Sequence, residues 1–147
     1  MKGKAIAVCV SEKKGTKKHP VPYAVLKKEH GIIGDAHAGD RRAGFRHRQV
    51  SLLADESADK MRAKGAELSA GDFAENILTK NIDLKSLSIG TRIHIGTAEL
   101  EVTQIGKECH YDCEIRRLTG QCVMPTEGIF AKVIKGGEIK AGDEIYI

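Results

Sequence analysis

Short runs in which apolar and polar residues alternate, separated by glycine-containing turns, make up much of the chain. The clearest run, TRIHIGTAELEVTQIG at 91–106, alternates on both sides of Gly96-Thr97 and predicts a β-hairpin. The C-terminal residues 128–147 predict one strand, a turn at Gly136-Gly137, a short return, and a last strand after Gly142-Asp143. Other segments rich in β-branched and small apolar residues predict strands at 4–10, 23–26, 49–53 and 73–82.

One helix stands out among these strands. The run ADESADKMRAKGAEL, from Ala54, has the alanines and the i,i+4 acid–base pairs of an exposed helix that ends at Gly65. A short turn is expected at 83–87 (DLKSL). About seven or eight closely spaced strands with one or a few short helices favour a mainly β fold, a closed or partly open β-barrel. No repeat or linker divides the chain, so one domain is expected over 1–147.

Composition narrows the classes of partner. Tryptophan is absent and aromatic residues make up 4% of the 147 residues, which argues against stacking platforms for single-stranded nucleic acid, and no nucleic-acid partner is expected. The first apolar run, AIAVCV at 5–10, is too short for the core of a signal peptide. No stretch approaches the ~20 apolar residues that span a bilayer. The expectation is a cytoplasmic protein with no membrane partner, whose thiols stay reduced.

Charge is unevenly distributed. Residues 1–48 hold twelve Lys or Arg against four Asp or Glu, a balance of +8, and the other 99 residues hold twelve against sixteen, a balance of −4. A basic N-terminal third suits an acidic partner or a small phosphorylated ligand. For the lysine-rich run SEKKGTKKH at 11–19, the favoured interpretation is a solvated loop. Residues 27–48 contain four glycines among His, Asp and Arg, which is typical of a functional loop.

Three of the four cysteines lie in GKECHYDCEIRRLTGQC at 106–122. Structural zinc usually takes two close pairs of ligands. Cys109 and Cys113 can form one pair, and Cys122 with His110 could complete a set, but His110 is adjacent to Cys109 and no second CxxC follows. The fourth, Cys9, lies in an apolar strand and is expected to pack as a small hydrophobe.

Cationic neighbours favour a reactive or metal-binding role for the three clustered thiols, because positive charge lowers a thiol pKa. Cys122 lies between Gly120 and Pro125, which indicates a thiol displayed on a tight loop. Displayed thiols suit nucleophilic sulfur transfer or ligation of a soft transition metal.

Together these segments resemble the MOSC domain, found at the C-terminus of molybdenum cofactor sulfurases and in small stand-alone bacterial proteins. The resemblance runs in order through five segments of the sequence: IGDAH (33–37), RHRQVSLL (46–53), GDFAENI (71–77), TQIGKECHYDC (103–113) and GQCVMPTEGIFAKVIKGGEIKAGDEI (120–145). Each segment alone is weak, but five in order are specific.

The resemblance implies a β-rich barrel with one essential cysteine, which either bears a persulfide sulfur or ligates the molybdenum of a pterin cofactor. The pattern of cysteine, proline and glycine falls on Cys122, Pro125 and Gly128. The Gly-Asp-x-His, Arg-Gln-Val and Glu-Asn-Ile elements of the family fall on residues 34–37, 48–50 and 75–77. On this basis Cys122 is the expected catalytic residue and metal ligand.

Further cofactor contacts are expected at Asn76, Cys109, His110 and Cys113, although many relatives carry proline or another residue at the positions of the two cysteines. No pyridoxal-phosphate desulfurase domain is present, so no pyridoxal phosphate is expected in this chain alone. Sulfur would have to come from a partner such as a cysteine desulfurase, or pass to a molybdoenzyme client.

The pterin phosphate needs positive charge and backbone N–H groups, which GDRRAGFRHRQ at 39–49 can supply. Cofactor contacts are therefore expected at Arg41, Arg42, Arg46 and Arg48. If a strand enters at Arg48, Arg46 and Arg48 share one face while His47 takes the other. His37, or alternatively His47, could hold or relay a proton, and His37 is the preferred catalytic histidine.

The sequence thus predicts a protein that binds the molybdenum cofactor, carries sulfur on a reactive cysteine, or does both, as a sulfur transferase or a component of a molybdenum-dependent oxidoreductase. Two alternatives stay open: a structural-zinc or anion-binding barrel without catalysis, and a molybdenum-dependent reductase of N-hydroxylated compounds that needs an external electron donor. The substrate, the sulfur donor and the oligomeric state are not predicted.

Overall fold

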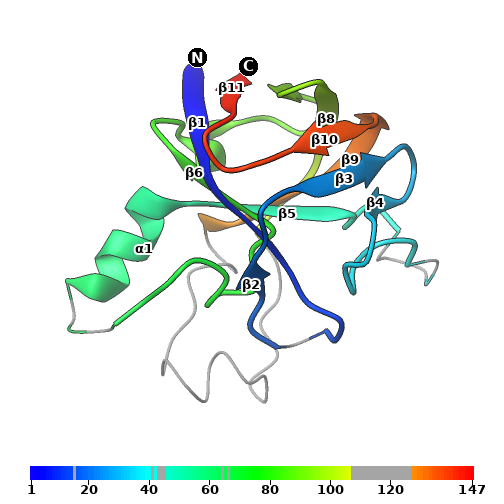
Figure 1. The fold of residues 1–147 in the computed structure, drawn as a ribbon. Coiled ribbons are helices and arrows are strands. Elements are labelled where there is room, and N and C mark those ends of the chain that lie inside the picture. Colours follow the sequence, from blue (N-terminus) through cyan, green and yellow to red (C-terminus); the bar gives the residue numbers. More distant parts are fainter. Residues whose placement is uncertain (15, 41, 43–45, 64, 66, 107–126) are drawn as a thin grey trace.

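The computed structural model describes residues 1–14, 16–40, 42, 46–63, 65, 67–106 and 127–147 (Figure 1). Its strands are β1 (Lys2–Val10), β2 (His19–Pro20), β3 (Ala24–Lys27), β4 (Gly31–Ile32), β5 (Val50–Ala54), β6 (Ile77–Lys80), β7 (Arg92–Ile95), β8 (Ala98–Ile105), β9 (Ile129–Lys135), β10 (Gly137–Ile139) and β11 (Glu144–Tyr146). The described residues also form helix α1 (Asp55–Arg62) and a 3-10 turn, η1 (Leu84–Ser86). Among them no helix has the length and apolar character needed to span a bilayer.

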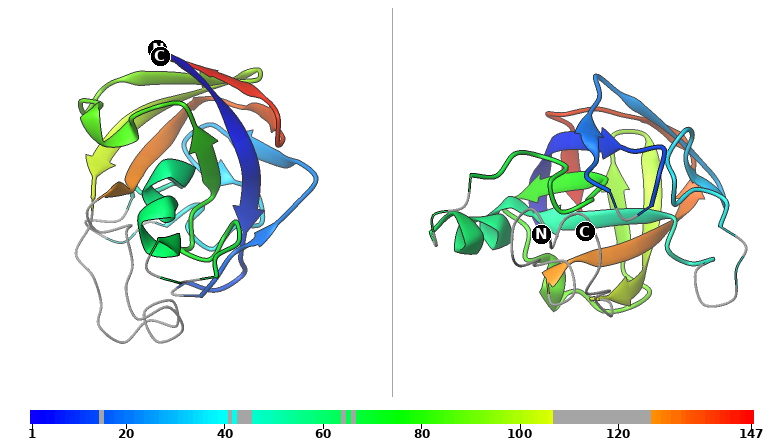
Figure 2. Two further views of the ribbon diagram at one scale, coloured as in Figure 1. Left: turned by 90° about the vertical axis from the view of Figure 1, so that its left-hand side faces the viewer. Right: turned by 90° about the horizontal axis from the view of Figure 1, so that it is seen from below.

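Seven strands close into a mixed barrel in the order β11-β7-β8-β9-β5-β6-β1, because β1 also pairs with β11. Most neighbours are antiparallel, and β5 and β6 are parallel. The closing ladder matches Lys2 with Tyr146 and Lys4 with Glu144. The two ends of the described chain therefore lie side by side, as Figure 2 shows.

Four short strands lie outside this ring. β2 adds to the edge of β1, and β10, β3 and β4 form a separate three-stranded antiparallel sheet. In Figure 1 this small sheet and α1 lie toward opposite ends of β5. The loops after β1 and β4 contact each other, since the N–H of Ala36 donates to the carbonyl of Ser11 at 2.8 Å and Lys14 bonds to Asp40.

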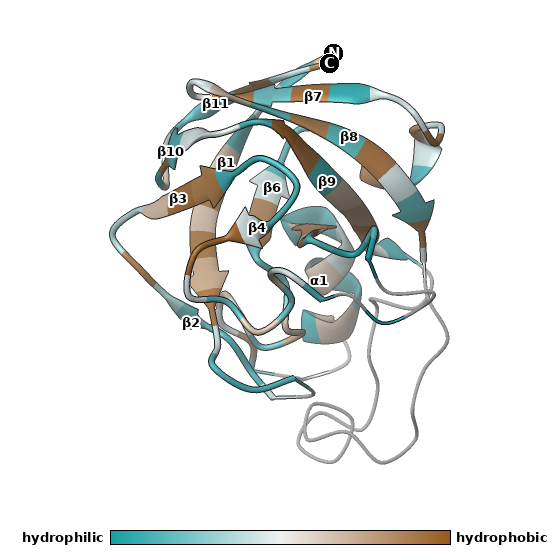
Figure 3. Ribbon diagram, turned by 90° about the vertical axis from the view of Figure 1, so that its right-hand side faces the viewer, coloured by the Kyte–Doolittle hydropathy of each residue, from teal (hydrophilic) through white to brown (hydrophobic). Residues whose placement is uncertain are grey.

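Alternation of apolar and polar residues explains the strands. Along β7 the burial pattern alternates exposed and buried, and β8 begins with a similar alternation, so one face of the hairpin fills the barrel (Figure 3). Fully buried side chains from several strands, including Leu52, Ile77, Leu100 and Ile129, form the main core. β5 is buried along its whole length because the barrel interior lies on one side and α1 on the other.

Helix α1 covers a second, smaller core. Its buried residues Ser57, Ala58 and Met61 face the barrel wall, where the apolar pair packs with Leu53 and Phe130. Acidic residues occupy its first turn and basic residues its last, which favours the helix dipole. The predicted barrel, helix, hairpin at Gly96-Thr97 and turn at 83–87 are confirmed. The two-residue strands β2 and β4 were not predicted.

Candidate functional site

The turn before β5 carries basic residues, and the first of them that the structure describes, Arg42, is paired with a carboxylate. Nη2 of Arg42 lies 3.0 Å from Oδ2 of Asp40, and its Nε lies 3.2 Å from Oδ1. Lys14, from the loop after β1, donates to the same carboxylate. The hydrogen bonds of Arg42, and then that of Lys14, hold the pKa of Asp40 well below its usual range. The charge of Arg42 is therefore already matched by a carboxylate. Arg41, the predicted neighbour in this role, lies outside the described residues.

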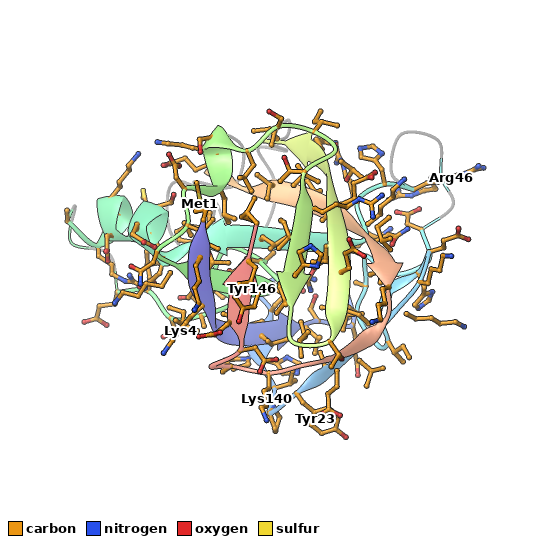
Figure 4. The ribbon with its side chains drawn as sticks, turned by 90° about the horizontal axis from the view of Figure 1, so that it is seen from above. Met1, Lys4, Tyr23, Arg46, Lys140 and Tyr146 are labelled. Atoms are coloured by element: carbon orange, nitrogen blue, oxygen red, sulfur yellow. The ribbon has the colours of Figure 1, made fainter. Side chains whose placement is uncertain are left out.

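A cleft of about 310 Å³ opens beside this turn. It is lined by Glu29, His30, Gly39, Asp40, Arg46 and Gln49. Arg46 is exposed, and Figure 4 shows its side chain extending outward at the edge of the molecule. Two carboxylates, Glu29 and Asp40, line the cleft together with Arg46.

The side chain of Gln104 contacts both His47 and Arg48, the last two basic residues before β5. Nε2 of His47 lies 2.6 Å from Oε1 of Gln104, and Nε of Arg48 donates to the same oxygen at 3.0 Å. The Arg48 guanidinium also lies over the Phe130 ring, 5.3 Å from its centroid, in cation–π geometry. Gln104 on β8 and Phe130 on β9 thus fix Arg48 against the barrel wall.

The expected alternation of faces across this turn is wrong. β5 begins only at Val50, and residues 46–49 form a turn, so a strand's two-residue period does not apply. His47 and Arg48 consequently bind the same oxygen of Gln104 instead of pointing apart. The structure brings His47 and Arg48 together and leaves Arg46 on the cleft.

The same glutamine reaches the base of the cysteine-bearing segment. Nε2 of Gln104 donates to the carbonyl of Gly106 at 2.7 Å, and the N–H of Gly106 donates to the carbonyl of Gly128 at 2.7 Å. These two glycines bracket residues 107–126. The predicted site residues Cys109, His110, Cys113 and Cys122 all lie within that range, outside the described residues.

Glu127 ties the C-terminal side of this base to α1. Its Oε1 accepts hydrogen bonds from Ser57 Oγ at 3.1 Å and from Lys60 Nζ at 2.7 Å. Burial alone would raise the pKa of Glu127, but the bonds from Lys60 and Ser57 lower it below its usual value. The segment that contains Cys122 is therefore bracketed by a hydrogen-bonded glycine pair and by a carboxylate fixed on the helix.

A buried charged cluster lies where the loops after β1 and β4 meet. Lys18 and Asp35 form an ion pair of 2.8 Å, and both side chains are 0% exposed. Nζ of Lys18 also lies 3.1 Å from Ser11 Oγ and 3.1 Å from His37 Nδ1. The expectation that residues 11–19 form a solvated loop is wrong at Lys18, because this side chain turns inward to a carboxylate that needs a counter-ion.

Burial lowers the pKa of Lys18, and the attraction of Asp35 opposes that shift. Burial alone would raise the pKa of Asp35, but the Lys18 ammonium and the Ser11 N–H hold it well below its usual range. We therefore describe the pair as ammonium and carboxylate at neutral pH. His37, the predicted catalytic histidine, sits on the outer side of this pair with a side chain that is 21% exposed.

The loop at 71–75 contacts the backbone of Lys18. The N–H of Lys18 donates to the carbonyl of Gly71 at 2.8 Å. Glu75 accepts the backbone N–H groups of Gly71 and Phe73 at 2.9 and 3.1 Å, and its burial raises its pKa. The GDFAENI element of the family resemblance thus forms a hydrogen-bonded loop that contacts the residue carrying the buried ammonium.

Asn76 is engaged inside the sheet. Its side chain is 0% exposed. Nδ2 donates to the Cys9 carbonyl at 3.0 Å, while Oδ1 accepts the N–H of Ser51 at 2.9 Å and its hydroxyl at 3.1 Å. These contacts join β1, β5 and the start of β6, an arrangement that favours a structural role over the predicted contact with a cofactor.

Cys9 is a core residue, as predicted. It is free and 0% exposed, and it packs in the smaller core between the barrel wall and α1. Burial, followed by the charge of Glu75, raises the pKa of the Cys9 thiol to about 12. Among the described residues, no group of three or more His, Cys, Asp and Glu side chains suits a metal ion.

Two residues of this region were missed in the sequence. Lys18 is one of four lysines in a short polar run, and nothing in that run separates it from its neighbours. Gln104 lies within TQIG, a segment that the family resemblance includes, but its polar side chain gives no sign of its three contacts. Both depend on partners more than fifteen positions away in the chain.

Comparison with known proteins identifies the family. Residues 34–146 match the MOSC domain. The chain belongs to the MOSC domain family. This family is associated with binding of the molybdenum cofactor. The matched range contains His37, Gln104 and Cys122, and begins after Lys18.

Solved structures share the MOSC fold seen here. The chain is similar to the YUAD protein from Bacillus subtilis, with a TM-score of 0.80 and 21% identity over 99% of this chain and 94% of that one. It is also similar to YiiM from Geobacillus stearothermophilus, with a TM-score of 0.72 and 18% identity over 97% and 73% of the two chains. For YiiM from Escherichia coli the values are 0.67 and 17%, over 99% and 68%. No curated protein matches the sequence.

Proposed function

We propose that this MOSC domain binds the molybdenum cofactor, or carries sulfur, with Cys122 as the residue that holds the metal or the persulfide. The observation that carries the proposal is the family match over residues 34–146, which includes Cys122, Pro125 and Gly128 in the family's order. The association of the family with the molybdenum cofactor supports the choice of ligand.

The described residues fit an anionic ligand at the base of the cysteine segment. Gln104 contacts the Arg48 guanidinium with its oxygen and the Gly106 carbonyl with its nitrogen. A guanidinium and the start of the segment are therefore held within the reach of one side chain. Guanidinium groups favour phosphate because two N–H donors can meet two oxygens. Arg48, with His47 beside it, is the group that we assign to the phosphate of the pterin.

The thiol would do one of two things in this setting. When bound, the cofactor supplies a soft metal centre, for which a cysteine thiolate is a fitting ligand. In sulfur transfer, the Cys122 thiolate attacks the outer sulfur of a donor persulfide. The sulfur–sulfur bond of the donor breaks as a new one forms on Cys122, and the donor cysteine leaves as a thiolate. No external oxidant is needed, since the sulfane sulfur arrives already oxidised.

The test compares Cys122→Ser with Cys9→Ala, a control that removes a thiol assigned to the core. Protein is purified without reductant, and its molybdenum, tungsten and zinc are measured together with cyanide-labile sulfur, released as thiocyanate. We expect metal or sulfane sulfur in wild type and in Cys9→Ala and its loss in Cys122→Ser, with little change in the melting temperature of Cys122→Ser. Stoichiometric zinc without molybdenum or sulfane sulfur would instead support the zinc-binding alternative.

The phosphate assignment has a separate test. Charge-assisted hydrogen bonds contribute roughly 1.5 to 3 kcal/mol each. Replacing Arg48 with Ala should therefore weaken binding of molybdopterin or of a phosphate analogue about tenfold or more. Lys17→Ala is the control, because Lys17 is also basic but contacts Asp72 at 3.6 Å. Wild-type affinity in Arg48→Ala would place the phosphate elsewhere.

A further inference from the structure

The buried cluster around Lys18 has no part in the thiol and phosphate chemistry described above. Nζ of Lys18 has three neighbours at hydrogen-bond distance: Asp35 Oδ1 at 2.8 Å, Ser11 Oγ at 3.1 Å and His37 Nδ1 at 3.1 Å. An ammonium carries three N–H donors and no acceptor. Each donor of Lys18 is thus matched by one acceptor, in a place where the Lys18 and Asp35 side chains are 0% exposed.

The contact with His37 determines where that ring carries its proton. Because an ammonium can only donate, Nδ1 of His37 must accept, and an accepting nitrogen has no hydrogen. Oδ2 of Asp35 is also near Nδ1, but it lies 3.6 Å away and already accepts the backbone N–H of His37 at 3.1 Å. A distance of 3.6 Å is too long for a side-chain hydrogen bond.

We propose that Lys18 is a positioning residue, which holds His37 in the neutral form with its proton on Nε2. Asp35 and Ser11 orient the ammonium, and the ammonium orients the ring. His37 is then prepared to donate from Nε2 to an oxygen or sulfur atom of a bound ligand. That use of the N–H rests on the proposed function, whereas the position of the proton does not.

Charged groups on several elements act on this cluster. The Lys18 ammonium, from the loop after β1, opposes protonation of Nδ1, and the Asp35 carboxylate, from the loop after β4, favours it. Glu75 on the 71–75 loop also raises the pKa of Lys18, whereas the Cys9 thiol on β1, with a pKa of about 12, is uncharged at neutral pH. Removal of the ammonium alone would leave a buried carboxylate beside the ring. His37 should then take a second proton on Nδ1 at a higher pH than in wild type.

The experiment reads the ring directly. Long-range 1H–15N correlation spectra of the His37 imidazole are recorded from pH 5 to 9 for wild type, Lys18→Met and Lys17→Met. In wild type we expect an unprotonated Nδ1 and a protonated Nε2 at neutral pH. In Lys18→Met the midpoint of the His37 titration should rise by about one pH unit or more. Lys17→Met should match wild type, because Lys17 contacts Asp72 instead.

A proton on Nδ1 in neutral wild-type protein would overturn the proposal, and this measurement needs no variant to fold. An equal midpoint in Lys18→Met and Lys17→Met would also overturn it. Lys18→Gln, which keeps an N–H donor without the charge, provides a second variant and should also raise the midpoint. In Cys122→Ser the proton of the neutral His37 ring should stay on Nε2. The metal and sulfur measurements therefore test the proposed function, whereas the His37 spectra test this inference, so the failure of one can be told from the failure of the other.

Discussion

Cys9 shows how strongly a single residue's surroundings set its chemistry. Its thiol is 0% exposed, and burial raises its pKa to about 12. At pH 8 the thiolate fraction of such a group is lower by on the order of a thousandfold than that of an ordinary cysteine with a pKa near 8.5. We expect Cys9 to be alkylated far more slowly than Cys122 in the folded protein, as followed site by site by mass spectrometry. Labelling of both at one rate would contradict the assignment of Cys9 to the core.

Asp35 gives a second prediction at this scale. Removal of one partner from a buried ion pair costs roughly 3 to 5 kcal/mol, so Asp35→Asn should lower the free energy of unfolding by about that amount at pH 7. The folded-state pKa of Asp35 lies below its unfolded value of about 3.9. Its ionisation therefore stabilises the fold above about pH 4, and that contribution is lost as the pH falls further.

Urea unfolding of wild type and Asp35→Asn at several pH values would check this. The difference between the two free energies of unfolding should begin to narrow below about pH 4. Glu138→Gln, which removes an exposed carboxylate on β10, serves as the control and should stay close to wild type. A difference that stays constant from pH 7 down to pH 2 would show that folding does not lower the pKa of Asp35, and would contradict a stabilising ion pair with Lys18.

Lys17 and Lys18 mark the limit of prediction from sequence at the scale of residues. They are identical neighbours in one polar run, yet Lys17 contacts Asp72 with a partly exposed side chain while Lys18 is enclosed against Asp35. Composition predicted solvation for both. The buried position could not be predicted because Asp35 lies 17 positions away and meets Lys18 only after the loops pack.

At the scale of elements, local pattern predicted most strands and the helix. The hairpin β7–β8 was predictable because alternation and a turn with positive φ at Gly96 lie in one continuous segment. The start of β5 was predicted one residue early, at residue 49, but the turn at 46–49 was not predicted, since the residues of RHRQVSLL do not indicate it. That difference moved His47 and Arg48 onto the same glutamine.

The loop at 71–75 should be sensitive to one added methyl group. Gly71 has a φ of +89°, and a Cβ there would lie 2.0 Å from the Lys18 carbonyl oxygen. We expect Gly71→Ala to lose roughly 2 to 5 kcal/mol, from the backbone conformation and from overpacking together. Gly142→Ala isolates the first effect, since Gly142 has a φ of +96° and nothing within 4 Å of such a Cβ.

Chemical denaturation of the two variants gives the comparison. Gly142→Ala should lose only about 1 to 2 kcal/mol, the cost of the left-handed conformation. Equal losses in both would mean that the contact between the 71–75 loop and Lys18 contributes little to the free energy of unfolding.

At the scale of the whole molecule, the sequence predicted the class of fold but not the strand pairings that close the barrel. The sequence indicated a closed or partly open barrel, because short strands with frequent turns are typical of both. Which strands pair is a property of segments far apart, such as β1 with β6 and β11, and it does not follow from either segment alone. The loops after β1 and β4 are likewise far apart in the sequence, and they are joined by the bond from the Ala36 N–H to the Ser11 carbonyl and by the Lys18–Asp35 pair.

Ile145 lets that closure be tested. It is 0% exposed on β11, where it faces Gly3 of β1 and Ile95 of β7, whereas the adjacent Tyr146 is 44% exposed. Ile145→Ala removes buried apolar atoms at the seam, so the free energy of unfolding should fall by roughly 2 to 5 kcal/mol. Tyr146→Ala alters the same strand from outside, where it loses the contact of its ring with Lys2, a loss of about 0.5 to 1 kcal/mol.

Amide hydrogen exchange can then locate the change. In Ile145→Ala the backbone N–H groups of β1 and β11 should exchange faster than those of the β5–β9 ladder, because the seam would open before the rest of the barrel. In Tyr146→Ala the two ladders should keep the order of protection found in wild type. If both variants were equally stable, or if every ladder in Ile145→Ala lost protection to the same extent, the β1–β11 seam would not be a separately opening part of the barrel.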